Sequence, residues 1–222
     1  MTLAIIFANG VLEGLVELPR LEDMDLVIAA DGGLRHALGL GVNPQVVIGD
    51  LDSAPNELLQ IAQRNGAEVI RHPAEKDKTD LELALDLARE RGADEIVVVA
   101  ARGGRVDHEL ANVLLLAGPR ATAGIRMVGA ASGTEVRGSS GRAYEMQVVT
   151  RSAEIHGAPG DIVSLLALGT TVTGVMTTGL QYPLEDGTLE LGSSRGVSNL
   201  MTAETASVAV GQGLLLVIHI PL

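Results

Sequence analysis

Residues 26–33 read LVIAADGG, a run of five apolar residues followed at once by Asp31, Gly32 and Gly33. A short run that is apolar on both faces is typical of a strand buried in the middle of a parallel sheet. An acidic residue and two glycines at its carboxyl end are typical of a turn into a helix, and open α/β sheets bind ligands at that edge. The segment therefore predicts a strand–turn–helix unit whose turn carries chemistry.

The same alternation continues on both sides of this segment, through about the first 130 residues. Further apolar runs predict strands at 3–8, 46–48, 68–70, 96–101 and 125–129. Helical segments are expected between them, at 34–40, 57–64, 81–91 and 109–117, the last with Leu110, Val113, Leu114 and Ala117 on one stripe. Strand–helix alternation predicts an α/β domain with a mostly parallel sheet flanked by helices.

The pattern changes after about residue 130, where no strong helical periodicity remains. Short β-type runs occur at 144–150, 162–167, 171–177, 189–191, 206–210 and 214–220, separated by Gly, Ser and Asp. Such spacing is typical of an all-β sandwich. We therefore expect two domains, an α/β domain over 1–131 and a β-sandwich domain over 132–222.

Composition excludes several classes of protein. The 222 residues are 46% hydrophobic, so a disordered chain is excluded, and the net charge of −12 argues against a general nucleic-acid binder. No apolar run approaches the roughly 20 residues of a membrane helix, and no basic segment precedes the apolar N-terminus. The chain has no cysteine, which excludes thiolate and Cys–zinc chemistry. We expect a cytoplasmic protein that contacts neither membrane nor nucleic acid.

Five aspartates stand directly after predicted strands or at the start of the helices that follow them. They are Asp31, Asp50, Asp52, Asp80 and Asp107. The carboxyl ends of parallel strands meet at one edge, so these side chains are expected on one rim, where a Mg²⁺ ion would relieve their repulsion. Any one of them is equally well explained as a helix cap, and Thr79 with Glu82 forms a capping box, but capping does not explain two aspartates in Asp50-Leu51-Asp52.

Two glycine pairs join strands to helices on the same rim, in Asp31-Gly32-Gly33 and Arg102-Gly103-Gly104-Arg105. Glycine allows close approach of backbone to phosphate, and helix N-termini favour anions. Lys76 and Lys78 are the other cations nearby, and His108 is a candidate acid or phosphate donor. Either glycine pair alone also fits an ordinary turn, and His108 also fits an ordinary first-turn residue. Neither a P-loop nor a dinucleotide fingerprint is present.

Six motifs in this order resemble the thiamine pyrophosphokinase (thiamine diphosphokinase) family. They are AADGG (29–33), IGDLDS (48–53), KDKTDLELAL (76–85), GGRVDHELAN (103–112), TTGLQYPL (177–184) and SRGVSNLM (194–201). The resemblance spans almost the whole chain. It implies an α/β domain followed by a β-sandwich, and a homodimer with active sites between the subunits. It also implies transfer of pyrophosphate from ATP to the hydroxyl of thiamine, which releases AMP.

The resemblance also implies roles for particular residues. Asp50, Asp52 and Asp80 resemble the catalytic Mg²⁺-binding set. The nucleotide site would include Asp31, Gly32, Gly33, Lys78, Thr79, Arg102, Gly103, Gly104, Arg105, Asp107 and His108. Ser198, Asn199 and Met201 resemble the thiamine pocket, donated by the other subunit. Either Asp80 or Asp50 would accept the proton of the thiamine hydroxyl.

One departure from the family concerns the thiamine pocket. Many members place an aromatic ring, often Trp, against thiamine near the Ser-Asn motif, whereas this chain has no Trp. Met201 or Tyr182 is the candidate to cover the ring, and core packing is the alternative role for Met201. Two other functions also fit parts of the sequence. Asp50-x-Asp52 suits a Mg²⁺-dependent phosphatase with an aspartyl nucleophile, and the fold suits a non-catalytic nucleotide or thiamine sensor.

Overall fold

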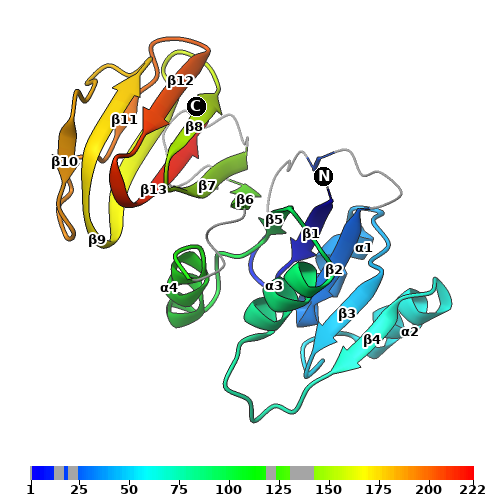
Figure 1. The fold of residues 1–222 in the computed structure, drawn as a ribbon. Helices are drawn as coiled ribbons and strands as arrows, with labels where there is room; N and C mark the ends of the chain where they lie inside the picture. The colour runs from blue at the N-terminus through cyan, green and yellow to red at the C-terminus, as the bar shows by residue number, and fades with distance from the viewer. Residues whose placement is uncertain (1, 13–17, 20–24, 119–123, 131–142) are drawn as a thin grey trace. The chain divides into compact units, whose positions relative to one another are not determined.

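The computed structural model describes residues 2–12, 18–19, 25–118, 124–130 and 143–222. Contacts within the chain divide it into two compact units (Figure 1). The first contains most described residues up to Leu115 together with 124–129, and the second contains mainly 143–222. Each unit is described by itself.

The first unit is built on a parallel sheet of six strands. The strands are β1 (Leu3–Phe7), β2 (Leu26–Ala30), β3 (Val46–Gly49), β4 (Glu68–Arg71), β5 (Glu95–Val99) and β6 (Ile125–Ala130). Their order is β4-β3-β2-β1-β5-β6, and Ile6 of β1 aligns with Ile28 on one side and Val98 on the other. All three side chains are fully or almost fully buried, because helices cover both faces of the central strands.

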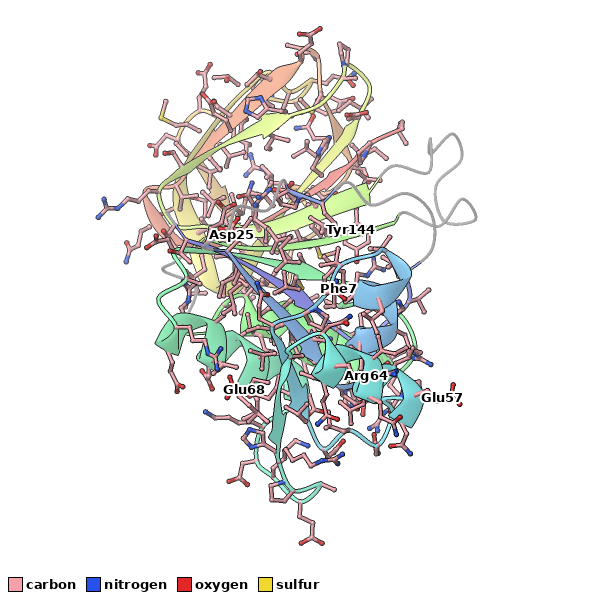
Figure 2. All side chains as sticks on the ribbon, turned by 90° about the vertical axis from the view of Figure 1, so that its right-hand side faces the viewer. Phe7, Asp25, Glu57, Arg64, Glu68 and Tyr144 are labelled. Atoms are coloured by element: carbon pink, nitrogen blue, oxygen red, sulfur yellow. The ribbon has the colours of Figure 1, made fainter. Side chains whose placement is uncertain are left out.

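Three helices cover this sheet. Helices α1 (Leu34–Gly39) and α2 (Asn56–Arg64) lie on one face, and α3 (Asp80–Glu90) lies on the other (Figure 1). Right-handed crossovers explain this, because the chain moves outward from β2 to β4 through α1 and α2 and then returns across the sheet through α3. Figure 2 shows Phe7 inside this unit and Glu57 projecting from the outer side of α2.

The direction of winding reverses between β1 and β5, which are neighbours in the sheet although the 87 residues 8–94 separate Phe7 from Glu95. In open parallel sheets such a reversal leaves a crevice outside the carboxyl ends of the strands, since the adjoining loops turn to opposite faces. The loops after β1, β2, β3 and β5 therefore meet at one edge of the first unit.

Helix α4 (Val106–Leu115) differs from the other helices, because none of its residues is buried. Of the predicted apolar stripe, Ala117 lies beyond the end of the helix. Leu110 and Leu114 lie on it, and Val106, Leu110 and Leu114 are 71%, 60% and 59% exposed. These three residues are four apart in sequence and so lie along one face of the helix. Periodicity identified this helix correctly and does not by itself say what covers its apolar face.

The second unit is all β. Its strands are β7 (Ala143–Val149), β8 (Ser152–His156), β9 (Ile162–Thr178), β10 (Gly187–Leu189), β11 (Asn199–Leu200), β12 (Thr205–Ala209) and β13 (Gln212–Ile220). The first half of β9 pairs with β13, which in turn pairs with β7. The second half of β9 pairs with β10 and β12, and β12 pairs with β8. All of these pairs are antiparallel.

Strand β9 replaces two strands that the sequence predicts, at 162–167 and 171–177. Gly169 and Gly174 have φ values of +83° and +67°, which glycine adopts without strain, so the strand continues through an irregularity where a break is expected. The register with β13 shifts at the same place, between Gln212 and Leu214. One strand thereby runs through both layers of the sandwich.

A compact apolar core fills the second unit. It includes Val163, Leu165, Val172, Val175, Leu189, Met201, Ala206, Val208, Leu215 and Val217, and Val163, Val172, Val175, Ala206 and Leu215 are completely buried. Aromatic side chains are absent from this cluster, so aliphatic residues supply the packing. Strand alternation on two facing sheets produces such a core.

The predicted fold class, an α/β unit followed by a β-sandwich, is confirmed. The predicted boundary between residues 131 and 132 lies outside the described residues, so the division into domains at 1–131 and 132–222 remains a proposal. Within the described part of the chain, no helix is both long enough and apolar enough to cross a membrane.

A buried carboxylate ties the C-terminus to the second unit. Asp161 is 2% exposed and accepts hydrogen bonds from the backbone N–H groups of Ala158 (2.8 Å) and Leu222 (3.1 Å), and its Oδ2 lies 3.0 Å from His219 Nε2. Burial alone would raise the pKa of Asp161, but these three contacts lower it below the ordinary value of 3.8. The ionised form is therefore the one that the fold stabilises.

Replacement of this carboxylate should destabilise the protein in a pH-dependent way. Asp161→Asn is expected to lower the free energy of unfolding by about 1–3 kcal/mol near neutral pH, because a hydrogen-bonded buried charge is lost. A depressed pKa stabilises the fold above 3.8, and this contribution disappears as the pH falls through the lower folded value. Urea unfolding at pH 7 and pH 3 measures both effects, with exposed Glu190→Gln as control. An equal difference at the two pH values would contradict this account.

Candidate functional site

A pocket of about 680 Å³ opens at the carboxyl edge of the first unit's sheet. The loops after the five strands β1 to β5 and the start of α3 line it, as expected for the carboxyl edge of a parallel sheet. Its polar lining residues are Asn9, Asp31, Asp50, Asp52, Ser53, Lys76, Asp77, Lys78, Thr79, Asp80, Arg105, His108 and Asn112. The backbones of Gly10, Gly103 and Gly104 also face it.

The turn after β3 presents two of the aspartates. Gly49 has a φ of +142° and Leu51 a φ of +63°, a conformation that costs a non-glycine residue about 1–2 kcal/mol. Leu51 is 7% exposed and packs into the core between β2, β3, α1 and α2, which offsets that cost. Its burial anchors the turn, and Asp50 and Asp52 on either side of it both line the pocket. Helix α2 begins after Pro55, so Asp52 is not its cap.

Asp31 is the buried member of the same group of aspartates. It is 5% exposed, has a φ of +48°, and its carboxylate accepts hydrogen bonds from Ser53 N (3.2 Å) and Asn9 Nδ2 (3.4 Å). Oxygen atoms of Asp31, Asp50 and Asp52 all lie within 4.8 Å of one another. At such a distance two like charges repel by about 3–4 kcal/mol at an effective dielectric constant of 20, so a cation at this position would be strongly favoured.

Asp80, the third member of the predicted metal set, lies outside the group formed by Asp31, Asp50 and Asp52 and instead pairs with Lys76. It begins α3 behind the N-cap Thr79, whose hydroxyl oxygen accepts a hydrogen bond from Glu82 N at 3.2 Å. Lys76 Nζ lies 3.1 Å from Asp80 Oδ1 and 2.8 Å from Asp50 Oδ2. Asp80 Oδ1 is buried, and among the described residues no well-aligned hydrogen bond reaches it.

Asp50, Lys76 and Asp80 shift one another's pKa values. A hydrogen bond from Lys76 lowers the pKa of Asp50. Burial raises the pKa of Asp80, and the attraction of Lys76 offsets only part of that shift. Burial alone would lower the pKa of Lys76, but its two carboxylate partners raise it, so the ammonium stays charged.

The first glycine pair serves close packing. A Cβ atom at Gly33 would lie 1.9 Å from the carbonyl oxygen of Phe7, and one at Gly32 would lie 2.1 Å from Asn9 Oδ1. Neither glycine lines the pocket. They allow the short helix η1 (Asp31–Gly33) to sit directly against the end of β1, which sets the position of Asp31.

The second glycine pair lies in the loop before α4. Arg102 pairs with Glu109 at 2.6 Å, and Glu109 also accepts a hydrogen bond from Gly103 N, so this loop is tied to its own helix. Gly103, Gly104, Arg105 and His108 line the pocket, whereas Arg102 and Asp107 do not. Arg105 hydrogen-bonds to Asp107 and holds the pKa of that exposed carboxyl at about 2.

The predicted thiamine residues lie in the second unit. Asn199 donates to Tyr182 O (2.8 Å) and accepts from Tyr182 N (3.0 Å), and Ser198, with a φ of +62°, donates its N–H to Ser164 Oγ. Met201 is 2% exposed and belongs to the core, whereas Tyr182 is 66% exposed. Of the two candidates to cover thiamine, Tyr182 is thus the accessible one, and Met201 has the packing role.

Two asparagines were not among the residues predicted from the sequence. Asn9, two residues after the end of β1, donates a hydrogen bond to Asp31 and accepts one from Arg35. Asn112 on α4 donates to the carbonyl oxygen of Ala101 at 2.7 Å. Both line the pocket. The only signal for Asn9 was its place after an apolar run, and the signal for Asn112 was its place at the end of the motif GGRVDHELAN.

Comparison with known protein families agrees with this geometry. A family model described as thiamin pyrophosphokinase, catalytic domain, matches residues 19–128, and one described as thiamin pyrophosphokinase, vitamin B1 binding domain, matches residues 147–215. The chain belongs to the thiamine pyrophosphokinase family. The first match contains all five predicted aspartates and Lys76, and the second contains Tyr182, Ser198 and Asn199.

Individual members of the family are similar over most of their length. Thiamine pyrophosphokinase of Bacillus subtilis is 27% identical over 199 residues, which is 89% of this chain and 88% of that protein. Thiamine pyrophosphokinase 1 of rice (Oryza sativa subsp. japonica) is 28% identical over 94% of this chain and 74% of its own. The crystal structure of the Bacillus subtilis protein superposes with a TM-score of 0.80 at 25% identity, covering 100% of this chain and 99% of that one. That of the Geobacillus thermodenitrificans protein gives 0.76 at 28% identity, with 99% and 97% covered.

The close packing of the first glycine pair predicts a clear difference between two Gly→Ala variants of this family member. Gly33→Ala is expected to lower the free energy of unfolding by at least about 1–3 kcal/mol, because a methyl group would overlap the backbone of β1. Gly39→Ala is the matched control, since nothing lies within 4 Å of a Cβ there and alanine favours the helix. Urea denaturation compares the two, and equal stability would show that β1 and η1 are not packed as described.

Proposed function

We propose that this protein is a thiamine diphosphokinase, which transfers the pyrophosphoryl group of ATP to the hydroxyl of thiamine and releases AMP. Membership of the family makes the protein an enzyme of this class, with ATP and thiamine as its substrates. The observation that carries the assignment to this site is the pocket at the edge of the parallel sheet. It places Asp31, Asp50, Asp52 and Asp80 together with Lys76 in the family's catalytic region.

We propose Mg²⁺ as the cofactor, because the residues present fit it. Clustered carboxylate oxygens are the ligands that Mg²⁺ prefers, and Asp80 Oδ1 is a buried acceptor without a well-aligned donor. A Cβ at Gly49 would lie 2.9 Å from that oxygen, so glycine keeps the space beside it open. Asp50, Asp52 and Asp80 would hold the ion, with Asp31 added by its position beside Asp50 and Asp52. When bound, the ion would neutralise charge on the phosphates.

The chain's own groups then have separable roles. Lys78, Arg105, His108 and Gly104 line the pocket, where their cationic or N–H groups could bind phosphate oxygens, whereas the N–H of Gly103 already donates to Glu109. The thiamine hydroxyl oxygen forms a bond to the β-phosphorus, and the bond from that phosphorus to the oxygen retained by AMP breaks. The hydroxyl proton passes to Asp80 or Asp50. Asp80 is the better placed of the two, since Asp50 Oδ2 already accepts a hydrogen bond from Lys76.

Recognition of thiamine is proposed for the second unit. Asn199 holds the loop that carries Tyr182 through two hydrogen bonds to the backbone of Tyr182, and the N–H of Ser198 is tied to Ser164 on β9. Tyr182 is the exposed aromatic residue of this unit and is proposed to cover the thiamine ring in place of the Trp of other members. Met201 would support it from the core.

We also propose that the protein is a homodimer and is located in the cytoplasm. A homodimer with the active site at the subunit interface is supported by the exposed apolar stripe of α4, which begins one residue after the pocket residue Arg105. A cytoplasmic location is supported by the absence of cysteine from the chain.

The reaction products test the function. Purified protein incubated with ATP, Mg²⁺ and thiamine should form thiamine diphosphate and AMP in equal amounts, as measured by mass spectrometry. Free phosphate without thiamine diphosphate would indicate a phosphatase instead. Binding of either ligand in a calorimeter without AMP release would indicate a sensor, and both results would contradict the proposal.

Asp80→Asn should reduce turnover about 100-fold or more, because the variant loses a proton acceptor and a charged metal ligand. Asp94→Asn is the control, since Asp94 is an exposed carboxylate before β5, at the opposite end of the strands from the pocket. Circular dichroism and thermal unfolding would verify that both variants keep the fold. Near-normal AMP production by a folded Asp80→Asn variant would exclude Asp80 from the mechanism.

A further inference from the structure

Lys76 occupies an unusual place in the pocket. The side chain is 14% exposed, and its ammonium group contacts two carboxylates from different elements, Asp50 in the turn after β3 and Asp80 at the start of α3. The chain contains one other lysine, Lys78, whose side chain is 46% exposed and pairs with Asp86 at 2.7 Å. The two lysines are two residues apart, yet only Lys76 is directed into the acidic group.

The contacts of Lys76 are those that a metal ion would need. Asp50 and Asp80 belong to the set proposed to hold Mg²⁺, and both direct an oxygen at Lys76 Nζ, at 2.8 and 3.1 Å. A protein ammonium group and a divalent cation cannot both occupy the space between two such oxygens. Each can neutralise the carboxylates, but only the ammonium is always present, because it is part of the chain.

The fit of the ammonium to this place is incomplete. Asp50 accepts a hydrogen bond from it, whereas Asp80 Oδ1 has no well-aligned donor within the described part of the chain. Lys76 is carried by the segment between β4 and α3, outside any helix or strand, on a flexible four-carbon stem. A ligand that satisfied both carboxylates would therefore displace it at little structural cost.

We propose that Lys76 is a displaceable counter-ion, which holds Asp50 and Asp80 together before the divalent cation binds and competes with that cation for them. Lys76 is thus a positioning residue that sets the metal affinity of the site. In the metal-free protein it prevents the carboxylates from repelling one another. When the cation leaves with the products, its return to Asp50 and Asp80 favours release.

The proposal makes a prediction that a purely structural role would not make. If Lys76 competes with the cation, then Lys76→Met should bind the cation more tightly than the unmodified protein. If Lys76 only holds the pocket together, its removal should scatter the carboxylates and weaken binding. The sign of the change therefore separates the two roles.

Titration of Mn²⁺ alone into the full-length protein, followed by calorimetry or by the electron spin resonance of free Mn²⁺, tests this. Lys76→Met is expected to lower the dissociation constant for Mn²⁺ about tenfold or more. A neighbouring positive charge changes the affinity of a carboxylate for a proton by at least about that factor, and its removal should favour a bound cation similarly. Lys78→Met, in the same segment, is the matched control and should stay within about twofold. An unchanged or larger dissociation constant for folded Lys76→Met would overturn the proposal.

Stability gives a second readout. With EDTA, Lys76→Met should unfold at a lower temperature than Lys78→Met, because its carboxylates lack a counter-ion, and Mn²⁺ should raise its unfolding temperature by more than that of the unmodified protein. If Lys76→Met does not fold in EDTA, recovery of folded protein on addition of Mn²⁺ supports the proposal. If Mn²⁺ does not restore it, Lys76→Gln replaces it in the titration, with the same two outcomes.

The inference rests on the proposed function only in placing a divalent cation at these carboxylates. Its test uses neither ATP nor thiamine, so the two can fail separately. Tighter Mn²⁺ binding by Lys76→Met, in a protein that forms no thiamine diphosphate, would support the counter-ion role and reject the activity. Unchanged or weaker Mn²⁺ binding by Lys76→Met, in a protein that does form thiamine diphosphate, would reject the counter-ion role and support the activity.

Discussion

Repulsion between carboxylates is the constraint on which the pocket depends. Asp31, Asp50 and Asp52 direct oxygens to within 4.8 Å of one another, and burial further disfavours the charge of Asp80. A fold that brings such groups together must supply positive charge or lose stability. Here Lys76 supplies it from within the chain, and the proposed divalent cation would supply it from outside. The same electrostatic need explains the ion pairs of Lys76 and would favour the binding of a cation.

The scaffold places these charges through apolar packing. Leu51 is buried in the core in spite of its positive φ, and the two aspartates beside it line the pocket. Gly33 allows η1 to meet the end of β1, which sets Asp31. Thr79 caps α3 and thereby places Asp80. In each case an unfavourable arrangement of charge or backbone is held by the burial or hydrogen bonding of a neighbour, as is common at functional sites.

The second unit is packed mainly by aliphatic side chains. The main core cluster contains no aromatic side chain, although Tyr144 is buried elsewhere in the unit, and aliphatic residues with Met201 fill the space between the two layers that β9 runs through. The Ser-Asn motif, which the sequence analysis assigned to ligand binding, makes internal hydrogen bonds that fix the backbone around Tyr182. The motif therefore has a structural role in this unit, in addition to the role in thiamine binding that we propose for the loop that carries Tyr182.

The sequence by itself determined the alternation of strands and helices, the change to β structure after about residue 130, and the gathering of acidic residues at one edge. These follow from local periodicity and from the rule that parallel strands end together. It did not determine that β9 is continuous, that Met201 is in the core, or that α4 exposes its apolar face. Nor did it separate Lys76, which binds Asp50 and Asp80, from Lys78, which binds Asp86. Those outcomes depend on contacts between residues distant in sequence, and only the tertiary structure sets such contacts.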